Sequence, residues 1–211
     1  EHPSTEVVCC AFGLSEGNQD VWTYLNPAIY HGAKNIMPPH IYEELYDPSV
    51  LIAAHNAGFD RLIWQLVAHK LAPTIFPVVP LEHWYCTSAM CRVNALPASL
   101  DDATRAIDSK HRKNHAGSAL IRKLSIPDKD TGEFSDDRGL LNDFAAYCED
   151  DLHATRELVH HCRSLTQADH EDWLINERIN DRGVTVDREL ATAAMQYAEV
   201  EQDSIKARLT E

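Results

Sequence analysis

A carboxylate stands where a short apolar run gives way to a helical pattern, in the stretch Ser49–Asp60. The run Val50–Ala54 is typical of a fully buried parallel strand, and polar and glycine residues end it abruptly. Apolar residues at helical spacing follow, which predicts that Asp60 lies in the first turn of a helix at the carboxyl end of a strand. Open α/β sheets bind their ligands at that edge. Asp60 is therefore a candidate for binding or catalysis, although a plain interaction with the helix dipole, with Asn56 as the N-cap, explains it equally well.

The helix that begins near Asp60 is expected to bury one apolar stripe. That stripe consists of Phe59, Ile63 and Leu66, widened by Leu62 and Val67.

A second carboxylate lies on the strongest helical pattern of the chain, Leu140–Ser164. Tyr147 and Asp151 are one helical turn apart, so their side chains project from the same side of this helix. Both lie at the border of the apolar stripe, where a tyrosine usually keeps its hydroxyl at the surface and an aspartate is usually solvated. Taken alone, the pair favours those ordinary roles over chemistry.

The remaining elements alternate between short strands and helices. Strands are expected at Thr5–Gly13 and Asp20–Leu25, joined by a hairpin turn, and at 84–86; helices are expected at 41–45, 87–93, 99–107, 118–124 and 189–208. A polar loop without periodicity is expected over 126–138. The pattern predicts an α/β fold.

Charge and composition limit the classes of function. The formal net charge of −14 argues against a protein that mainly coats duplex DNA. A basic cluster nevertheless breaks the acidic chain, and it is either a solvated helix face or a local phosphate contact. Its members are Lys110, His111, Arg112, Lys113, His115, Arg122 and Lys123. No apolar run is long enough to span a membrane, and the first residues do not form a signal peptide.

The six cysteines form no CxxC pair and mostly lie in apolar patterns, which favours reduced, buried thiols in a cytoplasmic protein. A zinc site with His160, His161 and Cys162 is disfavoured, because no second ligand pair has the required spacing.

In combination, these motifs resemble a known family. Asn56, Phe59 and Asp60 match the N-x-x-F-D motif, and Tyr147 and Asp151 match the Y-x-x-x-D motif, of the four-carboxylate 3′-5′ exonucleases of the tyrosine subclass. The segment 177–187 and the helical pattern after it resemble the start of the polymerase region in phage-type family A DNA polymerases.

The resemblance implies a ribonuclease-H-like mixed sheet flanked by helices, two divalent ions (Mg²⁺ or Mn²⁺) and hydrolysis of the 3′-terminal phosphodiester of single-stranded DNA. Asp60 and Asp151 would bind the metals, and Tyr147 would position the attacking water. Asn56 would help to fix the entering strand, and Phe59 would stack near the terminal base. It also implies an exonuclease-like domain at 1–165 and the beginning of a polymerase region at 166–211.

The pattern departs from the family in one respect. The family's first motif, a D-x-E on the first strand, supplies two of the four carboxylates, and this chain has no D-x-E that is followed by Thr. We therefore expect a fragment cut at both ends, with its first strand missing and with weak or absent nuclease activity. The alternatives are a catalytically silent platform for the polymerase and a ribonuclease on the same fold. We expect a monomer whose partners are the DNA 3′ end and the rest of the polymerase chain, in the cytoplasm of a bacterial or phage-infected cell.

Overall fold

The structure, a computed structural model, describes residues 5–14, 21–111 and 116–209. The chain divides into two compact units, Glu1–Leu174 and Ile175–Glu211, and each is described by itself. The first unit contains every strand among the described residues and both carboxylates singled out by the sequence. None of the described helices is both long and apolar enough to cross a membrane.

The expected N-terminal hairpin is confirmed. Strands β1 (Cys9–Gly13) and β2 (Val21–Leu25) pair antiparallel, with Cys9 opposite Leu25 and Gly13 opposite Val21. The turn expected between them, at 15–20, lies outside the described residues.

The expected strand before Asp60 is confirmed as β3 (Ile52–Ala54), which pairs in parallel with β4 (Trp84–Cys86). Between them the chain forms α2 (Ala57–Ile63), the π-helical segment η1 (Trp64–Ala68), α3 (His69–Leu71) and the short 3-10 helix η2 (Leu81–His83). The prediction of a fully buried strand is wrong, because β4 is the one neighbour that β3 has among the described strands. Ala53 and the preceding Leu51 are consequently exposed.

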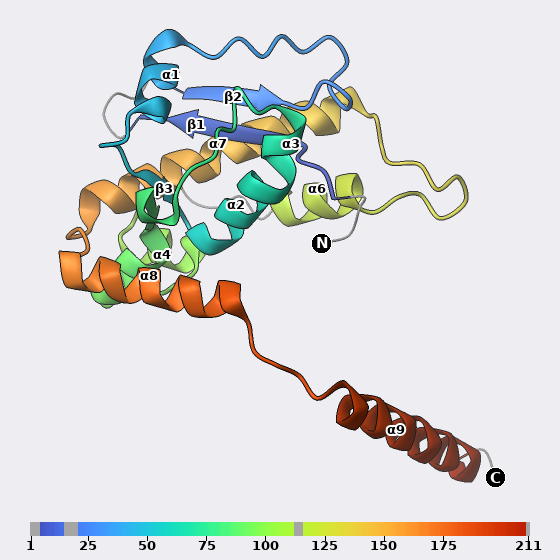
Figure 1. Cartoon of the computed structure of the whole chain (residues 1–211). Coiled ribbons are helices and arrows are strands. Elements are labelled where there is room, and N and C mark those ends of the chain that lie inside the picture. Colours follow the sequence, from blue (N-terminus) through green and yellow to red (C-terminus); the bar gives the residue numbers. More distant parts are fainter. Residues whose placement is uncertain (1–4, 15–20, 112–115, 210–211) are drawn as a thin grey trace. The chain divides into compact units, whose positions relative to one another are not determined.

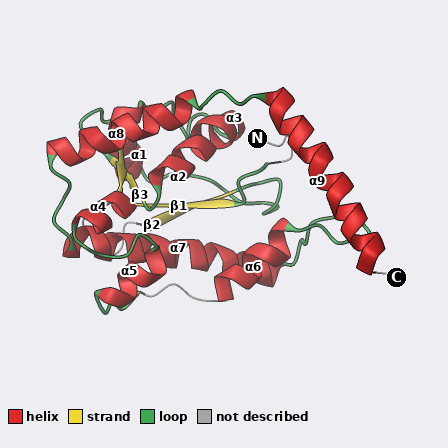
Figure 2. Ribbon diagram, turned by 90° about the horizontal axis from the view of Figure 1, so that it is seen from below, coloured by secondary structure: helices red, strands yellow, loops and turns green. Residues whose placement is uncertain are grey.

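The expected long helix is confirmed as α7 (Arg138–His161), and it organises the first unit. The hairpin lies between α7 on one face and the α2–η1–α3 segment on the other (Figures 1 and 2). The helix approaches β1 so closely that a Cβ on Gly13 would lie 2.5 Å from the Arg156 guanidinium. The opposite side of α7 packs against α4 (Thr87–Val93), α5 (Leu100–Ala106) and α6 (Ala116–Ser125).

An aromatic cluster joins the two small sheets into one core. Trp64 packs edge-on against Phe76 and Trp84, with ring centroids 4.9 Å and 5.6 Å apart, and Phe12 of β1 lies 5.7 Å from Trp64. Such pairs stabilise the fold by about 0.5–1.5 kcal/mol each beyond the burial of their area. The core thus fixes α2, which carries Asp60, against the hairpin.

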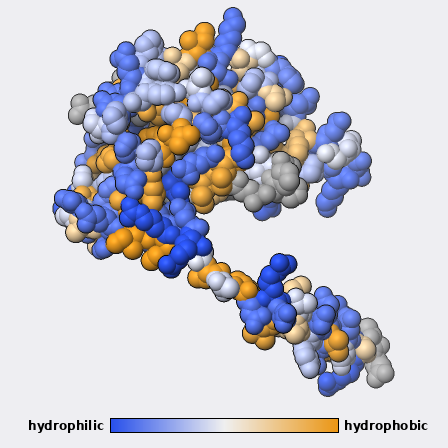
Figure 3. Space-filling model, viewed as in Figure 1, coloured by the Kyte–Doolittle hydropathy of each residue, from blue (hydrophilic) through white to orange (hydrophobic). Residues whose placement is uncertain are grey.

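Three further helices complete the chain. Helix α1 (Pro39–Tyr46) begins with the expected proline, and α8 (Gln167–Arg182) begins in the first unit. Helix α9 (Arg188–Leu209) closely matches the expected 189–208 helix. None of the described residues of α9 is buried, and its hydrophobic side chains are scattered among hydrophilic ones (Figure 3). The fold is therefore α/β, with two two-stranded sheets among many helices in the described residues.

Candidate functional site

Asp60 lies in the first turn of α2, directly after β3, as predicted. Asn56 occupies the N-cap position, as predicted, but its side chain makes no capping hydrogen bond. The reason is its left-handed backbone, with φ 68° and ψ 49°, in place of the extended conformation of a capping residue. Asparagine is among the few residues that adopt this conformation readily, which gives Asn56 a backbone role at the strand-to-helix turn.

The carboxyl group of Asp60 is in an unusual electrostatic environment. Burial raises the pKa of Asp60 to about 6, from an ordinary value of 3.8, and a hydrogen bond from its own backbone N–H offsets part of that rise. Burial disfavours the charged form of a carboxyl group that has no cation beside it. Such a perturbed group next to a sheet edge is a functional-site candidate on physical grounds.

Tyr147 and Asp151 lie together on α7, and their side chains share a hydrogen bond. Tyr147 is 7% exposed, so the expectation of a hydroxyl at the surface is wrong. The cause is that α7 is covered on both sides, by the hairpin and by α5 and α6, which leaves the border of the apolar stripe inside the unit. Burial, followed by the charge of Asp151 and the hydrogen bond to it, raises the pKa of Tyr147 above its ordinary value of 10.0. Tyr147 therefore stays protonated and can donate a hydrogen bond, but it cannot serve as a base at neutral pH.

Thiols of β1 and α7 interact electrostatically with the two carboxylates, and the sequence motifs did not indicate this. Burial, followed by the charges of Cys148 and Asp60, raises the pKa of Cys10, and the charge of Asp151 acts on Cys148. Cys148 in turn shares a hydrogen bond with Cys9, which raises the pKa of Cys9 and lowers that of Cys148. Asp60 and Asp151 thus act on two thiols that also interact with each other, Cys10 and Cys148. No spacing rule links Cys9 to Cys148, so only the pairing of β1 with α7 reveals their contact.

The predicted apolar stripe of the Asp60 helix is confirmed for Val67, which is buried, and for Ile63, which packs against the core, but it is wrong for its other three members. Phe59, Leu62 and Leu66 are 62%, 39% and 40% exposed. The buried side chains of α2 and η1 are those of Ala57, Arg61, Trp64, Val67 and Ala68. The large Trp64 ring fixes this choice, because it is a central member of the aromatic cluster and the face that carries it must turn inward. Phe59 is therefore a solvent-facing aromatic residue directly beside Asp60.

The other groups noted in the sequence remain apart from this site. Of the basic cluster, Lys110, Arg122 and Lys123 are exposed, and Arg112, Lys113 and His115 lie outside the described residues. His111 stacks on His153 of α7 with ring centroids 5.0 Å apart. At the end of α7, His160 and His161 are exposed while Cys162 is buried.

The metal-binding capacity of the described residues is limited. Within 5–14, 21–111 and 116–209, no group of three or more histidine, cysteine, aspartate or glutamate residues could hold a metal ion. Two adjacent divalent cations need several converging oxygen ligands. Asp60 and Asp151 could each contribute one carboxylate, but they do not complete such a set among the described residues.

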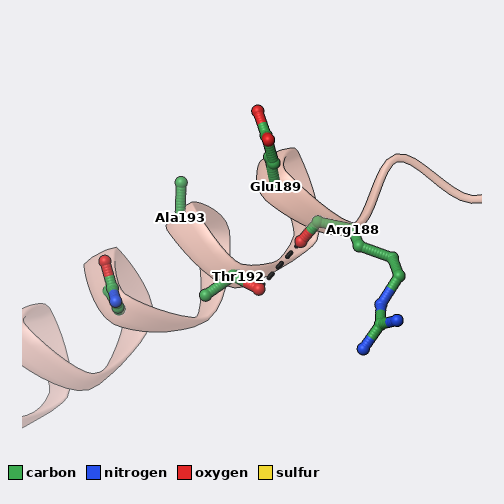
Figure 4. Close-up of a pocket in the computed structure, with 5 residues that line it drawn as sticks. Arg188, Glu189, Thr192 and Ala193 are labelled. Carbon is green, nitrogen blue, oxygen red and sulfur yellow. Dashed lines mark hydrogen bonds between the residues drawn. The ribbon is translucent and has the colours of Figure 1, made fainter.

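A shallow hollow in the second unit lies on one helix. Arg188, Glu189, Thr192, Ala193 and Gln196 line it, and all five belong to α9 (Figure 4). Thr192 donates a hydrogen bond to the Arg188 carbonyl oxygen at 2.8 Å, as a threonine within a helix commonly does. The hollow is a helix surface and carries none of the site residues predicted from the sequence.

Comparison with known proteins relates the chain to a viral replication enzyme. The chain is similar to a DNA polymerase of Bacillus phage SP02, with 27% identity over 169 residues that cover 75% of this chain and 25% of the polymerase. It thus spans about a quarter of the length of that relative. No family model matches the chain, and no solved structure does. The relationship is to a region of a phage DNA polymerase.

Proposed function

We propose that the chain is the 3′-5′ proofreading exonuclease region of a phage-type DNA polymerase, acting on the 3′ end of single-stranded DNA in the infected bacterial cell. The observation that supports this most directly is the buried Tyr147, hydrogen-bonded to Asp151. The charge of Asp151 acts on Cys148, and the charges of Asp60 and Cys148 both act on Cys10 of the hairpin. The similarity to a phage DNA polymerase supports the same assignment from an independent direction. In this proposal residues 1–165 form the exonuclease region and 166–211 begin the polymerase region.

The side chains around the site suit distinct roles. Tyr147, kept protonated, would donate a hydrogen bond and orient a water molecule. Phe59 presents an exposed ring on which a terminal base can stack, a contact that contributes about 1–3 kcal/mol per base. Asn56, at the exposed turn before α2, would contact the entering strand.

The proposed chemistry also requires divalent metal ions. When bound, Mg²⁺ or Mn²⁺ would lower the pKa of the attacking water and stabilise the leaving oxygen. Because Asp60 and Asp151 alone do not make up the ligand set, we assign no reaction step through the metals. We expect this chain to hydrolyse DNA slowly or not at all.

The proposal is tested with 5′-labelled single-stranded DNA and a matched RNA of the same sequence. Fluorescence anisotropy with this chain should show tighter binding of linear DNA than of circular DNA or RNA. Phe59→Ala should weaken the binding, whereas Leu71→Ala, a change at another exposed apolar residue, on α3, should not. Equal binding of linear and circular DNA would refute recognition of a 3′ end, and preferential binding and cleavage of RNA would favour a ribonuclease.

A second function, a catalytically silent platform for the polymerase, is favoured by the incomplete ligand set in the described residues. The two functions differ in a longer polypeptide that contains this chain. Under the exonuclease proposal, Asp60→Asn and Asp151→Asn abolish 3′-5′ hydrolysis and leave DNA synthesis unchanged. Under the platform proposal, the unaltered polypeptide already lacks hydrolysis.

A further inference from the structure

Helix α6 touches the Tyr147 ring through a residue that has no side chain. A Cβ atom on Gly117 would lie 2.2 Å from Cε2, 2.4 Å from Cζ and 2.7 Å from Cδ2 of Tyr147. All three distances are shorter than real Cβ contacts, and the two shortest are to Cζ, which bears the hydroxyl, and to its neighbour Cε2. The α6 backbone therefore forms one wall of the space that holds Tyr147.

The need for glycine here is steric. Gly132 and Gly183 adopt positive φ angles of 72° and 68° and have open space around them, so they serve the backbone conformation. Gly117 is in a helix and has no positive φ angle. Glycine weakens a helix compared with alanine, so at this position it provides room for the ring at the expense of helix stability.

Other contacts hold the ring from different directions. Phe144, on the preceding turn of α7, stacks near Tyr147 with ring centroids 6.2 Å apart and an interplanar angle of 23°. The Tyr147 hydroxyl shares its hydrogen bond with Asp151, on the following turn. At the far end of α6, Leu124 packs with Leu141 of α7 and Tyr30, which anchors the helix. The ring is thus enclosed by α6 and α7 together.

We propose that Gly117 is a positioning residue that sets where the Tyr147 hydroxyl meets Asp151. Ordinary van der Waals contact begins near 3.4 Å, so a methyl group at Gly117 would displace the ring or α6 by about 1 Å. The effect of this displacement on catalysis rests on the proposed exonuclease function, in which Tyr147 orients the attacking water. A displacement of that size in a catalytic group can lower a rate by about 100-fold.

The experiment compares Gly117→Ala with a control on the same helix, Ala119→Gly, which changes an exposed residue. The readout is the NMR signal of Tyr147 Cζ in protein made with labelled tyrosine, assigned with Tyr147→Phe. In Gly117→Ala the signal should move in the direction seen in Asp151→Asn, because both changes disturb the same hydrogen bond. In Ala119→Gly it should stay in place although that helix is weakened.

An unmoved Tyr147 signal in Gly117→Ala, together with a raised melting temperature, would overturn the proposal. If Gly117→Ala does not fold, the double variant Gly117→Ala/Tyr147→Ala decides, because removing the ring makes room for the methyl group. The double variant should then melt above Tyr147→Ala, and a lower melting temperature would overturn the proposal. The NMR comparison needs no catalysis, so the absence of hydrolysis in the unaltered protein would count against the exonuclease function alone.

Discussion

Replacing Asp60 with asparagine should stabilise the protein at neutral pH. The folded state holds the pKa of Asp60 at about 6, against 3.8 for the ordinary group, so the ionised carboxylate opposes folding. A difference of that size corresponds to about 3 kcal/mol for a fully buried group. Asp60 keeps part of its surface exposed, and solvent screening reduces the expected gain for Asp60→Asn to about 1–2 kcal/mol.

The gain should depend on pH with a defined sign. Because the folded-state pKa is raised, the cost of Asp60 is nearly absent below the unfolded pKa and complete once the pH exceeds the folded pKa. The stability difference between Asp60→Asn and the unaltered protein should therefore be small near about pH 3.5. It should grow between about pH 4 and 6 and reach a plateau above about pH 7.

Urea unfolding, followed by tryptophan fluorescence, measures this difference, since Trp64 and Trp84 are buried in the core. Asp128→Asn is the control of opposite sign, because hydrogen bonds from the Thr131 and Asp130 backbones lower the pKa of Asp128. That variant should lose stability at neutral pH. An Asp60→Asn protein no more stable than the original at pH 7.5, or equally stabilised at both extremes of pH, would refute the argument from burial.

Three further predictions concern local structure. Asn56→Ala should destabilise the protein by about 1 kcal/mol and Asn56→Gly should not, because the left-handed backbone penalises a Cβ atom. Thermal melting compares the two variants. Equal losses of stability would contradict a backbone role for Asn56. Ser99→Ala should lower the free energy of unfolding by about 1 kcal/mol, as measured by urea unfolding, because the Ser99 side chain caps α5 by accepting a hydrogen bond from the Asp102 N–H at 3.2 Å. An unchanged free energy of unfolding would show that this cap does not stabilise α5. Mild oxidation with a small disulfide reagent should join Cys9 to Cys148, because their thiols are hydrogen-bonded, and it should release two equivalents of reduced reagent. Peptide mass mapping detects the link. If the link does not form, the packing of β1 on α7 is contradicted.

Local patterns predicted most elements of the fold because their causes are local. The Ser99 cap and the first-turn proline of α1 mark helix starts through the chemistry of single residues. The alternation at Val21–Leu25 likewise gave the second strand of the hairpin. The burial of β3 and of α2 was mispredicted, because burial depends on partners distant in the sequence. One neighbouring strand leaves Ala53 exposed, and the position of Trp64 in the aromatic cluster decides which face of α2 turns inward.

In the candidate site, too, features with local causes were predictable from the sequence and features that depend on distant residues were not. The one-turn spacing of Tyr147 and Asp151 was enough to predict that they share a side of α7, and their hydrogen bond agrees with it. The burial of Tyr147 was not predictable from α7 alone, since α6 covers it through Gly117. Nor could the sequence indicate the raised pKa of Asp60, which depends on surroundings supplied by the whole unit.

The mispredicted face of α2 bears directly on the proposed function. A stripe of Phe59, Leu62 and Leu66 packed in the core would leave a polar surface beside Asp60, but all three side chains are exposed. An aromatic ring with flanking leucines on the surface is a cost to solubility unless something covers it. Bases of single-stranded DNA have apolar faces that suit such a surface, and the exposed ring sits one residue from the candidate carboxylate. Under the proposed function, this exposed surface beside Asp60 is where the strand would bind.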